Sequence, residues 1–196
     1  MTIDDKQAYM RLDTYKTDGF SRGASRAKEA FWIMFAGRVV ASFLPGSRWR
    51  RAILRLFGAN VGKGVVIKPG VRVKFPWRLT IGAQCWIGES VWIDNLEAIS
   101  IGSHCCVSQG VYLCTGNHRW DKVTFDLECA PITIESESWI GAFALIGPGT
   151  HVERAAVLMM GSVANGRITA RTVYSGNPSQ AIKDRTMSST TDHSLE

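Results

Sequence analysis

One histidine is a candidate for chemistry because of the segment in which it lies. His118 occurs in YLCTGNHRWD, where a regular part of the sequence gives way to an irregular one. Imidazole side chains titrate near neutrality, at about 6.5 when unperturbed, so they can remove a proton from a hydroxyl group. Two carboxylates downstream, Asp121 and Glu128, could accept a hydrogen bond from the ring and orient it. Taken alone, a histidine in a loop is more often a solvated bystander than a catalytic base.

A six-residue repeat runs through most of the chain and must position this histidine. The first positions of the hexads are Val61, Ile67, Val73, Ile81, Ile87, Ile93, Ile101, Val107, Leu113, Ile134, Ile140, Ile146, Val152, Leu158 and Ala164. A small or β-branched residue recurs four places later, and glycine often follows the aliphatic residue directly. Period six fits neither a helix nor a simple strand. It predicts a solenoid with three flat faces per coil, whose aliphatic residues point inward and whose glycines relax the corners.

The spacing of the coils predicts an inserted loop and three regions of the chain. Coils begin at positions 61, 81 and 101, and the next begins only at 134. We therefore expect a loop at about 119–133 that projects from the third coil, with His118 at the junction between coil and loop. Residues 1–58 are expected to form an arm and a helical cap, and residues 59–169 the solenoid. Residues 170–196 are expected to form a C-terminal extension that ends in a disordered tail at 186–196.

The segment 21–58 is basic and carries two helical patterns. It holds eight Lys or Arg residues against one acid, Glu29. One helix is expected at about 27–44 and a second at 47–57, with Ser47 as its N-cap. In the second helix the apolar face would hold Trp49, Ile53, Leu56 and Phe57, and the opposite face Arg48, Arg51 and Arg55. This arm could attach peripherally to an anionic membrane surface, or it could simply cap the first coil.

Composition and cysteine usage narrow the class of protein. The rest of the chain is close to electrically neutral, which does not favour a nucleic-acid-binding body. Five cysteines, an odd number without paired metal-ligand spacing, predict a reduced, cytoplasmic setting and no metal site. No early apolar run resembles a secretory signal, and the longest apolar stretch, 30–44, is short for a membrane span. If the basic arm binds lipid, the expected location is the inner face of the membrane.

Several motifs together resemble a known family. The hexapeptide phasing, the inserted loop, YLCTGNHRWD, PITI…SWIGAFALIGPG and SGNPSQAI are similar to the left-handed β-helix acyltransferases over about residues 32–183. The colanic-acid-type sugar O-acetyltransferases of exopolysaccharide biosynthesis are the branch most similar to this chain. The resemblance implies an all-β solenoid, a left-handed parallel β-helix with an inserted loop and an N-terminal helical segment. It also implies a homotrimer, acetyl-CoA as co-substrate without a metal, and a sugar or lipid-linked oligosaccharide as acceptor.

The resemblance assigns roles to particular positions. His118 would be the general base. Acetyl-CoA would lie between subunits, against Trp139, Ala142, Met160, Asn165, Gly166 and Lys183. Two positions depart from the family pattern, since Met160 is usually small and Gly166 is often lysine; the phosphate contact could then come from Arg167 or Arg171. The acceptor side would be lined by Glu89, Trp92, Asp94, Asn95, Tyr112 and Trp120, although loop packing or solvated corners explain the same residues.

Two rival functions remain on this scaffold. Carbonic anhydrases with this fold need three histidines on a metal between subunits, whereas no second histidine follows His118 within thirty residues. A non-catalytic β-helix that only binds or scaffolds would need no histidine under the loop. Other acyl acceptors, such as serine or an amino-sugar nitrogen, are also compatible with the scaffold because fold alone does not define substrate.

Overall fold

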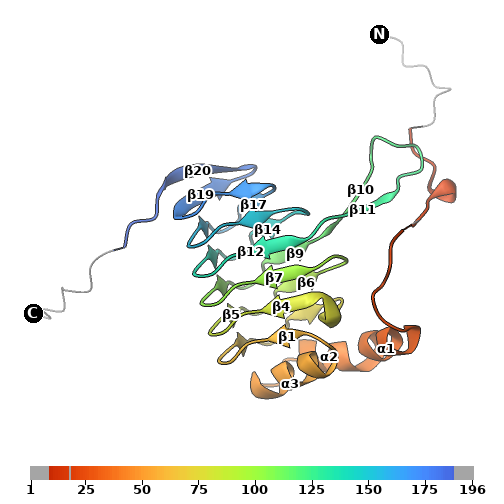
Figure 1. Ribbon diagram of the computed structural model, residues 1–196, viewed down its shortest axis with the longest axis horizontal. Coiled ribbons are helices and arrows are strands. Elements are labelled where there is room, and N and C mark those ends of the chain that lie inside the picture. The colour runs from red at the N-terminus through yellow and green to blue at the C-terminus, as the bar shows by residue number, and fades with distance from the viewer. Residues whose placement is uncertain (1–8, 18, 188–196) are drawn as a thin grey trace, which may run out of the picture.

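The chain forms a parallel β-solenoid whose coils stack from an N-terminal helical cap to a C-terminal hairpin (Figure 1). The computed structural model describes residues 9–17 and 19–187. The predicted tail at 186–196 lies outside the described residues except for Thr186 and Met187. No helix among the described residues is long and apolar enough to cross a bilayer.

Three sheets form the faces of the solenoid. Sheet A contains β1 (Asn60–Val61), β4 (Leu79–Ile81), β7 (Ile99–Ile101), β12 (Ile132–Ile134), β15 (His151–Val152) and β18 (Arg167–Ile168). Sheet B contains β2 (Val66–Ile67), β5 (Trp86–Ile87), β8 (Cys106–Val107), β13 (Trp139–Ile140), β16 (Val157–Leu158), β19 (Thr172–Gly176) and β20 (Ser179–Asp184). Sheet C contains β3 (Arg72–Val73), β6 (Trp92–Asp94), β9 (Tyr112–Cys114), β14 (Leu145–Ile146) and β17 (Val163–Ala164). Within these three sheets the described strands pair in parallel, except that β20 returns antiparallel along β19.

The repeat predicted from the sequence is the core of this fold. Along sheet B the first hexad positions stack in register, as in Ile87 on Val107 and Ile140 on Leu158, and all are buried. The small residues four places on are also buried, among them Cys85 and Cys105. Side chains alternate across a strand, so each short strand points one aliphatic residue inward and leaves its neighbour on the outer face.

Glycine has two roles in the coils. Gly82 and Gly102 do not adopt the left-handed conformation. An added Cβ at Gly82 would lie 2.6 Å from the carbonyl carbon of Gly102, so glycine here permits close approach of stacked coils. The left-handed corner position is taken by glycine in some coils, as at Gly64 with φ of 74°, and by other residues elsewhere, such as Gln84 and His104 with φ of 57° and 59°. Glycine therefore permits close contact between coils directly after the aliphatic position and, as expected, also relaxes some of the corners.

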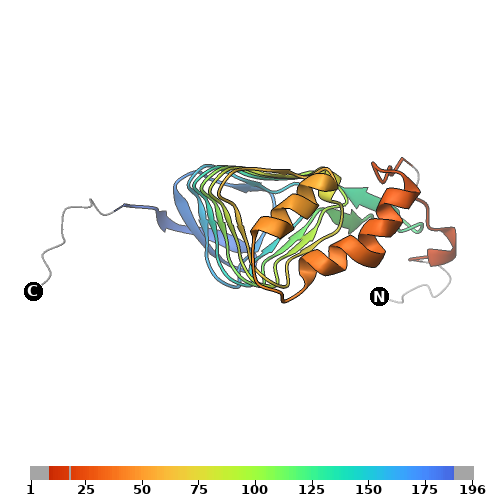
Figure 2. The same ribbon diagram turned by 90° about the horizontal axis from the view of Figure 1, so that it is seen from below.

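Two helical segments lie side by side across the first coil (Figure 2). The first runs through α1 (Arg26–Phe31), a π-helical turn η2 (Trp32–Ala36) and α2 (Gly37–Ala41). The second is α3 (Arg48–Leu56). Short 3-10 turns occur at η1 (Leu12–Thr14) and η3 (Pro76–Arg78). Trp32 is buried and its indole N–H donates to the Val73 carbonyl, which anchors the first helix to the coil.

The two faces expected for α3 are wrong. Leu56 is 80% exposed, whereas Arg51 and Arg55 point to the coil and donate to the carbonyls of Val65 and Val61. These arginines satisfy carbonyl groups at the open end of the solenoid, where no further coil supplies N–H donors. Ser47 stands at the N-cap, but its hydroxyl bonds to the backbone of Ile67 rather than to the helix.

The inserted loop is present and begins slightly earlier than expected. It is an antiparallel hairpin of β10 (Gly116–His118) and β11 (Leu127–Cys129), which leaves the corner between sheets C and A. His118 therefore lies within the first hairpin strand rather than at the junction with the coil. The N-terminal arm climbs from α1 to this hairpin (Figure 1), where the Arg11 N–H donates to the Val123 carbonyl at 2.7 Å.

Candidate active site

His118 is held in one orientation by the hairpin that carries it. Its Nδ1 lies 3.0 Å from the carbonyl oxygen of Phe125. A carbonyl oxygen can only accept, so Nδ1 carries the proton in the neutral ring and Nε2 keeps its lone pair. The imidazole also stacks on the Phe125 ring, with centroids 4.3 Å apart and planes 4° from parallel. The arrangement provides a fixed imidazole with Nε2 free to accept a proton.

The hydrogen bond to His118 depends on an unusual backbone at Phe125. Phe125 adopts φ of 50°, a left-handed conformation that is uncommon for a bulky side chain. The Phe125 N–H donates to the Lys122 carbonyl, and the Arg119 N–H donates to the Asp126 carbonyl, so the hairpin end is bonded across both strands.

Neither carboxylate proposed to orient the ring does so in this structure. Asp121 accepts two hydrogen bonds from the Arg119 guanidinium, and this ion pair lowers the pKa of Asp121 to about 2. Glu128 is exposed and lies opposite Asn117 in the hairpin register. Proximity in the sequence suggests these acids, whereas the folded hairpin places the backbone carbonyl of Phe125 against the imidazole.

The N-terminal arm adds a residue that sequence reasoning did not find. The Tyr15 ring lies 5.8 Å from the His118 ring and is inclined by 53° to it. About a hundred positions separate these residues, and no motif links them in the sequence. His118 therefore has aromatic neighbours from both the hairpin and the arm, and the residue is half-buried.

Sheet C brings together three of the residues expected on the acceptor side. Trp92 and Tyr112 stack with centroids 4.6 Å apart. The Tyr112 hydroxyl donates to Asp94 at 3.0 Å, and the Lys74 ammonium lies 2.9 Å from the same carboxylate. Partial burial, with the nearby Cys114 and Asp94, raises the pKa of Tyr112, so its hydroxyl remains a donor. This polar and aromatic strip ends at Cys114, two residues before the hairpin starts.

The other expected acceptor residues do not join that strip. Asn95 is fully buried, and its amide donates to the Phe75 carbonyl and accepts from the Phe75 N–H. It is a structural residue, and the expectation of substrate contact is wrong in this chain. Glu89 is exposed at the corner between sheets B and C. Trp120 is 80% exposed on the hairpin, beyond His118.

The expected cofactor residues fall on several faces of the solenoid. Trp139 lies on the outer face of sheet B and donates through Nε1 to the Ser108 hydroxyl at 3.0 Å. Ala142 and Met160 lie at the corner between sheets B and C, where Ala142 is buried and Met160 is 72% exposed. Their positions leave Met160 and Trp139 accessible to a ligand from outside.

The remaining members lie further around the coil. Asn165 and the left-handed Gly166 are exposed at the corner between sheets C and A, the corner from which the hairpin leaves. Arg167, on sheet A, forms an ion pair with Glu153 at 2.5 Å, and Lys183 is exposed on β20. In a single chain the expected cofactor residues therefore lie on several faces of the solenoid and do not form one pocket.

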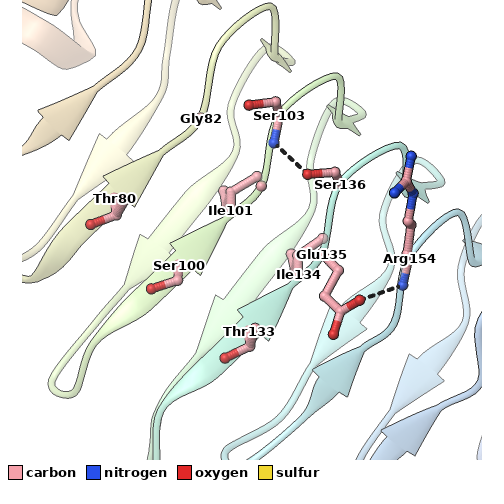
Figure 3. Close-up of a pocket in the computed structure, with 11 residues that line it drawn as sticks. Thr80, Gly82, Ser100, Ile101, Ser103, Thr133, Ile134, Glu135, Ser136 and Arg154 are labelled. Atoms are coloured by element: carbon pink, nitrogen blue, oxygen red, sulfur yellow. Dashed lines mark hydrogen bonds between the residues drawn. The ribbon is translucent and has the colours of Figure 1, made fainter.

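A groove on the outer face of sheet A contains none of these residues. Figure 3 shows Thr80, Ser100 and Thr133 in a row on successive strands, with Glu135 accepting from the Arg154 N–H at its rim. Among the described residues, its only ionisable lining side chains are the Glu135 carboxylate and the Arg154 guanidinium. In the part of the chain that the structure describes, no three His, Cys, Asp or Glu residues cluster as a metal site.

Comparison with known proteins assigns the family. The pattern described as "Hexapeptide repeat of succinyl-transferase" matches residues 78–114 and 131–164. An Escherichia coli (strain K12) protein, provisionally named as the colanic acid biosynthesis acetyltransferase WcaF, is 35% identical over 167 residues, or 85% of this chain and 92% of that protein. The Escherichia coli galactoside O-acetyltransferase is 25% identical over 138 residues, covering 69% of this chain and 68% of the relative.

The fold agrees with this assignment. A hexapeptide-repeat acetyltransferase from Vibrio cholerae O1 biovar eltor, solved with acetyl-coenzyme A, superimposes with a TM-score of 0.75. It is 24% identical, and the match covers 89% of this chain and 97% of that one. The predicted left-handed parallel β-helix is confirmed. The chain belongs to the hexapeptide-repeat acetyltransferases and is an acyltransferase.

Proposed function

We propose that the protein transfers the acetyl group of acetyl-CoA to a hydroxyl group of a sugar, with His118 as general base. The observation that carries this proposal is the hydrogen bond from His118 Nδ1 to the Phe125 carbonyl, which leaves Nε2 unprotonated. A base must present its lone pair in a fixed direction to a hydroxyl group. The named relatives act in acetyl transfer, and one solved neighbour holds acetyl-coenzyme A.

The reaction needs no covalent enzyme intermediate. His118 Nε2 takes the proton of the sugar hydroxyl as its oxygen forms a bond to the thioester carbonyl carbon. The tetrahedral oxyanion is stabilised by hydrogen-bond donors, and it collapses as the carbon–sulfur bond breaks. The imidazolium then returns its proton to the CoA sulfur, so the products are the acetyl ester and free CoA. Holding both substrates in place contributes a large part of the rate.

The distribution of site residues supports an oligomer. Trp92 and Tyr112 lie on sheet C, and His118 lies on the hairpin that follows this sheet. Trp139 lies on sheet B, and Met160 lies at the corner between sheets B and C. A second copy packed beside the first can bring these surfaces to opposite walls of one cleft. We propose a homotrimer of roughly 65 kDa, three times the 21.6 kDa chain, with acetyl-CoA between subunits. Light scattering that shows an active monomer would contradict it.

The acceptor is proposed to be a precursor of an exopolysaccharide or related surface polysaccharide. Support comes from the Asp94 carboxylate, which can accept a hydrogen bond from a sugar hydroxyl, and from the partly exposed Trp92 and Tyr112 rings, which stack on each other beneath the Arg72 guanidinium. The name of the 35% identical relative places that protein in colanic acid biosynthesis. Peripheral membrane contact through residues 21–58, which would suit a lipid-linked acceptor, is a further part of this proposal.

A panel of acceptors tests the assignment. CoA release from acetyl-CoA would be measured with oligosaccharide repeat units, nucleotide sugars, an amino sugar and serine. Release with sugars that lack an amino group, and a new acetyl ester in the product by mass spectrometry, is the expected result. Acetylation of nitrogen alone would make the protein an N-acetyltransferase. If no acceptor supports CoA release, the result would favour a non-catalytic binding protein over an enzyme.

A further inference from the structure

The helical cap exposes an unusual number of large apolar side chains. Its buried stripe, Trp32, Ala36 and Val40, faces the first coil, as expected for a helix packed on a core. The opposite side is also apolar. The exposed large apolar residues of the cap, here called the cap surface, are Phe31, Ile33, Met34, Phe35, Val39, Phe43, Leu44 and Leu56. Soluble monomers rarely leave such a group of large apolar residues uncovered without a partner.

The aromatic members of the cap surface are ordered by packing. Phe31 lies 5.5 Å from Phe35 and stacks on the buried Phe57 at 6.0 Å, measured between ring centroids. The following linker is also fixed, because the buried guanidinium of Arg50 donates to the carbonyls of Ser42 and Leu44. Phe43 nevertheless remains 80% exposed. The cap therefore holds these side chains outward on a rigid support.

The charges of the cap identify the chemistry of its partner. Arg26, Arg38 and Arg48 are exposed, and none forms an ion pair within the described residues. The one acid of the segment 21–58, Glu29, is buried and already paired with Arg22. The exposed cap thus combines apolar and cationic groups without a free carboxylate. A second copy meeting it face to face would place arginines against arginines, which disfavours that contact.

We propose, resting on the membrane contact included in the proposed function, that the cap surface binds an anionic lipid bilayer, with the solenoid standing on the membrane at its first coil. Apolar side chains of an interfacial helix enter the boundary between headgroups and acyl chains, and flanking arginines contact anionic headgroups. Each arginine near such a surface strengthens binding about fivefold. The contact residues differ from the arginine face expected from the sequence, because Arg51 and Arg55 are committed to carbonyls of the first coil.

This geometry has a consequence for the reaction site. The His118 hairpin leaves the third coil, two strand spacings or about 10 Å above the first. The site would then stand above the lipid headgroups rather than within them. An acceptor tethered to the same leaflet could present its sugar to the hairpin while its lipid stays in the bilayer.

Vesicle sedimentation tests the proposal with the full-length protein. Vesicles of phosphatidylethanolamine with phosphatidylglycerol are compared with phosphatidylcholine alone, at low and high salt. We expect binding only to the anionic vesicles, weakening as salt screens the arginines. Phe35→Glu should lower binding at least about tenfold, because a carboxylate replaces a ring in the lipid contact. Ile182→Glu is the matched control, since Ile182 is similarly exposed at the opposite end of the solenoid.

Two further measurements keep the outcomes distinct. Arg38→Gln with Arg48→Gln alters only exposed side chains, so a folded variant with weakened anionic binding would support the proposal even if Phe35→Glu misfolds. Light scattering on Phe35→Glu reports whether the cap surface instead joins copies of the chain. A wild-type protein that ignores anionic vesicles at low salt would overturn the proposal. So would equal losses in Phe35→Glu and Ile182→Glu, or a Phe35→Glu variant whose main defect is a smaller assembly.

Discussion

The imidazole of His118 and the backbone carbonyl of Phe125 form a 3.0 Å hydrogen bond within one hairpin, and the two rings stack at 4.3 Å. Phe125→Gly keeps this carbonyl and tolerates the left-handed backbone, but it removes the stacked ring. We expect kcat to fall about tenfold, because the base loses part of its orientation. Val123→Gly is the control, since it loosens the same hairpin without touching the imidazole. Equal losses in both variants would mean that hairpin stiffness, and not the stack, matters.

Tyr15 tests the contribution of the N-terminal arm. Its ring lies beside His118, at the side from which the arm approaches the hairpin. Tyr15→Ala should raise the acceptor KM about threefold or more and leave the KM for acetyl-CoA unchanged, because it opens one wall of the acceptor side. Tyr15→Phe should behave as wild type if the ring alone is needed. Tyr9→Ala, on the same arm and 72% exposed, provides the matched control. Unchanged kinetics in Tyr15→Ala would remove the arm from the site.

Asn95 separates a structural role from a substrate role. Its amide pairs with both backbone groups of Phe75 in the coil below, in a fully buried position. Asn95→Ala should lower the free energy of unfolding by about 2 kcal/mol, because two buried backbone groups lose their partners. The acceptor KM of the folded protein should not change. A raised KM without loss of thermal stability would restore Asn95 to the acceptor site.

Arg50 holds the helical cap together. Its guanidinium is buried and donates to the carbonyls of Val40, Ser42, Leu44 and Gly46. Arg50→Met should destabilise the cap by about 3 kcal/mol and lower the thermal unfolding midpoint, since those carbonyls lose charged donors. Arg48→Met, on the exposed side of the same helix, should leave the midpoint nearly unchanged. Comparable midpoints for both variants would show that the cap does not depend on this side chain.

The solenoid could be predicted because its information is local and repeated. Every coil places an aliphatic residue such as Ile87 or Ile140 at the same phase, so fifteen hexads report one structure. The position of His118 on an inserted loop followed from the gap in that phase. The repeat thus supplied the framework and the neighbourhood of the site.

The partners within the site could not be predicted in the same way. The group that orients His118 is a backbone carbonyl. Every residue has one, so the sequence does not reveal this partner and favours the nearby acids instead. Asn95 resembles its polar neighbour Asp94 in sequence, but the pleat turns one inward and the other outward. Tyr15 reaches the site only because the arm climbs past two coils. Contacts of this kind depend on tertiary packing.

The central claim is that His118 is the base of an acetyl-CoA-dependent transfer to a sugar hydroxyl. The most direct measurement is the turnover of purified His118→Ala with acetyl-CoA and the acceptor selected from the panel, beside wild type and His151→Ala. His151 is an exposed histidine paired with Glu135, away from the hairpin, and serves as the matched control. We predict that kcat falls at least about 100-fold in His118→Ala alone, with unchanged thermal stability and assembly size. Near-normal turnover in a folded His118→Ala protein would contradict the account.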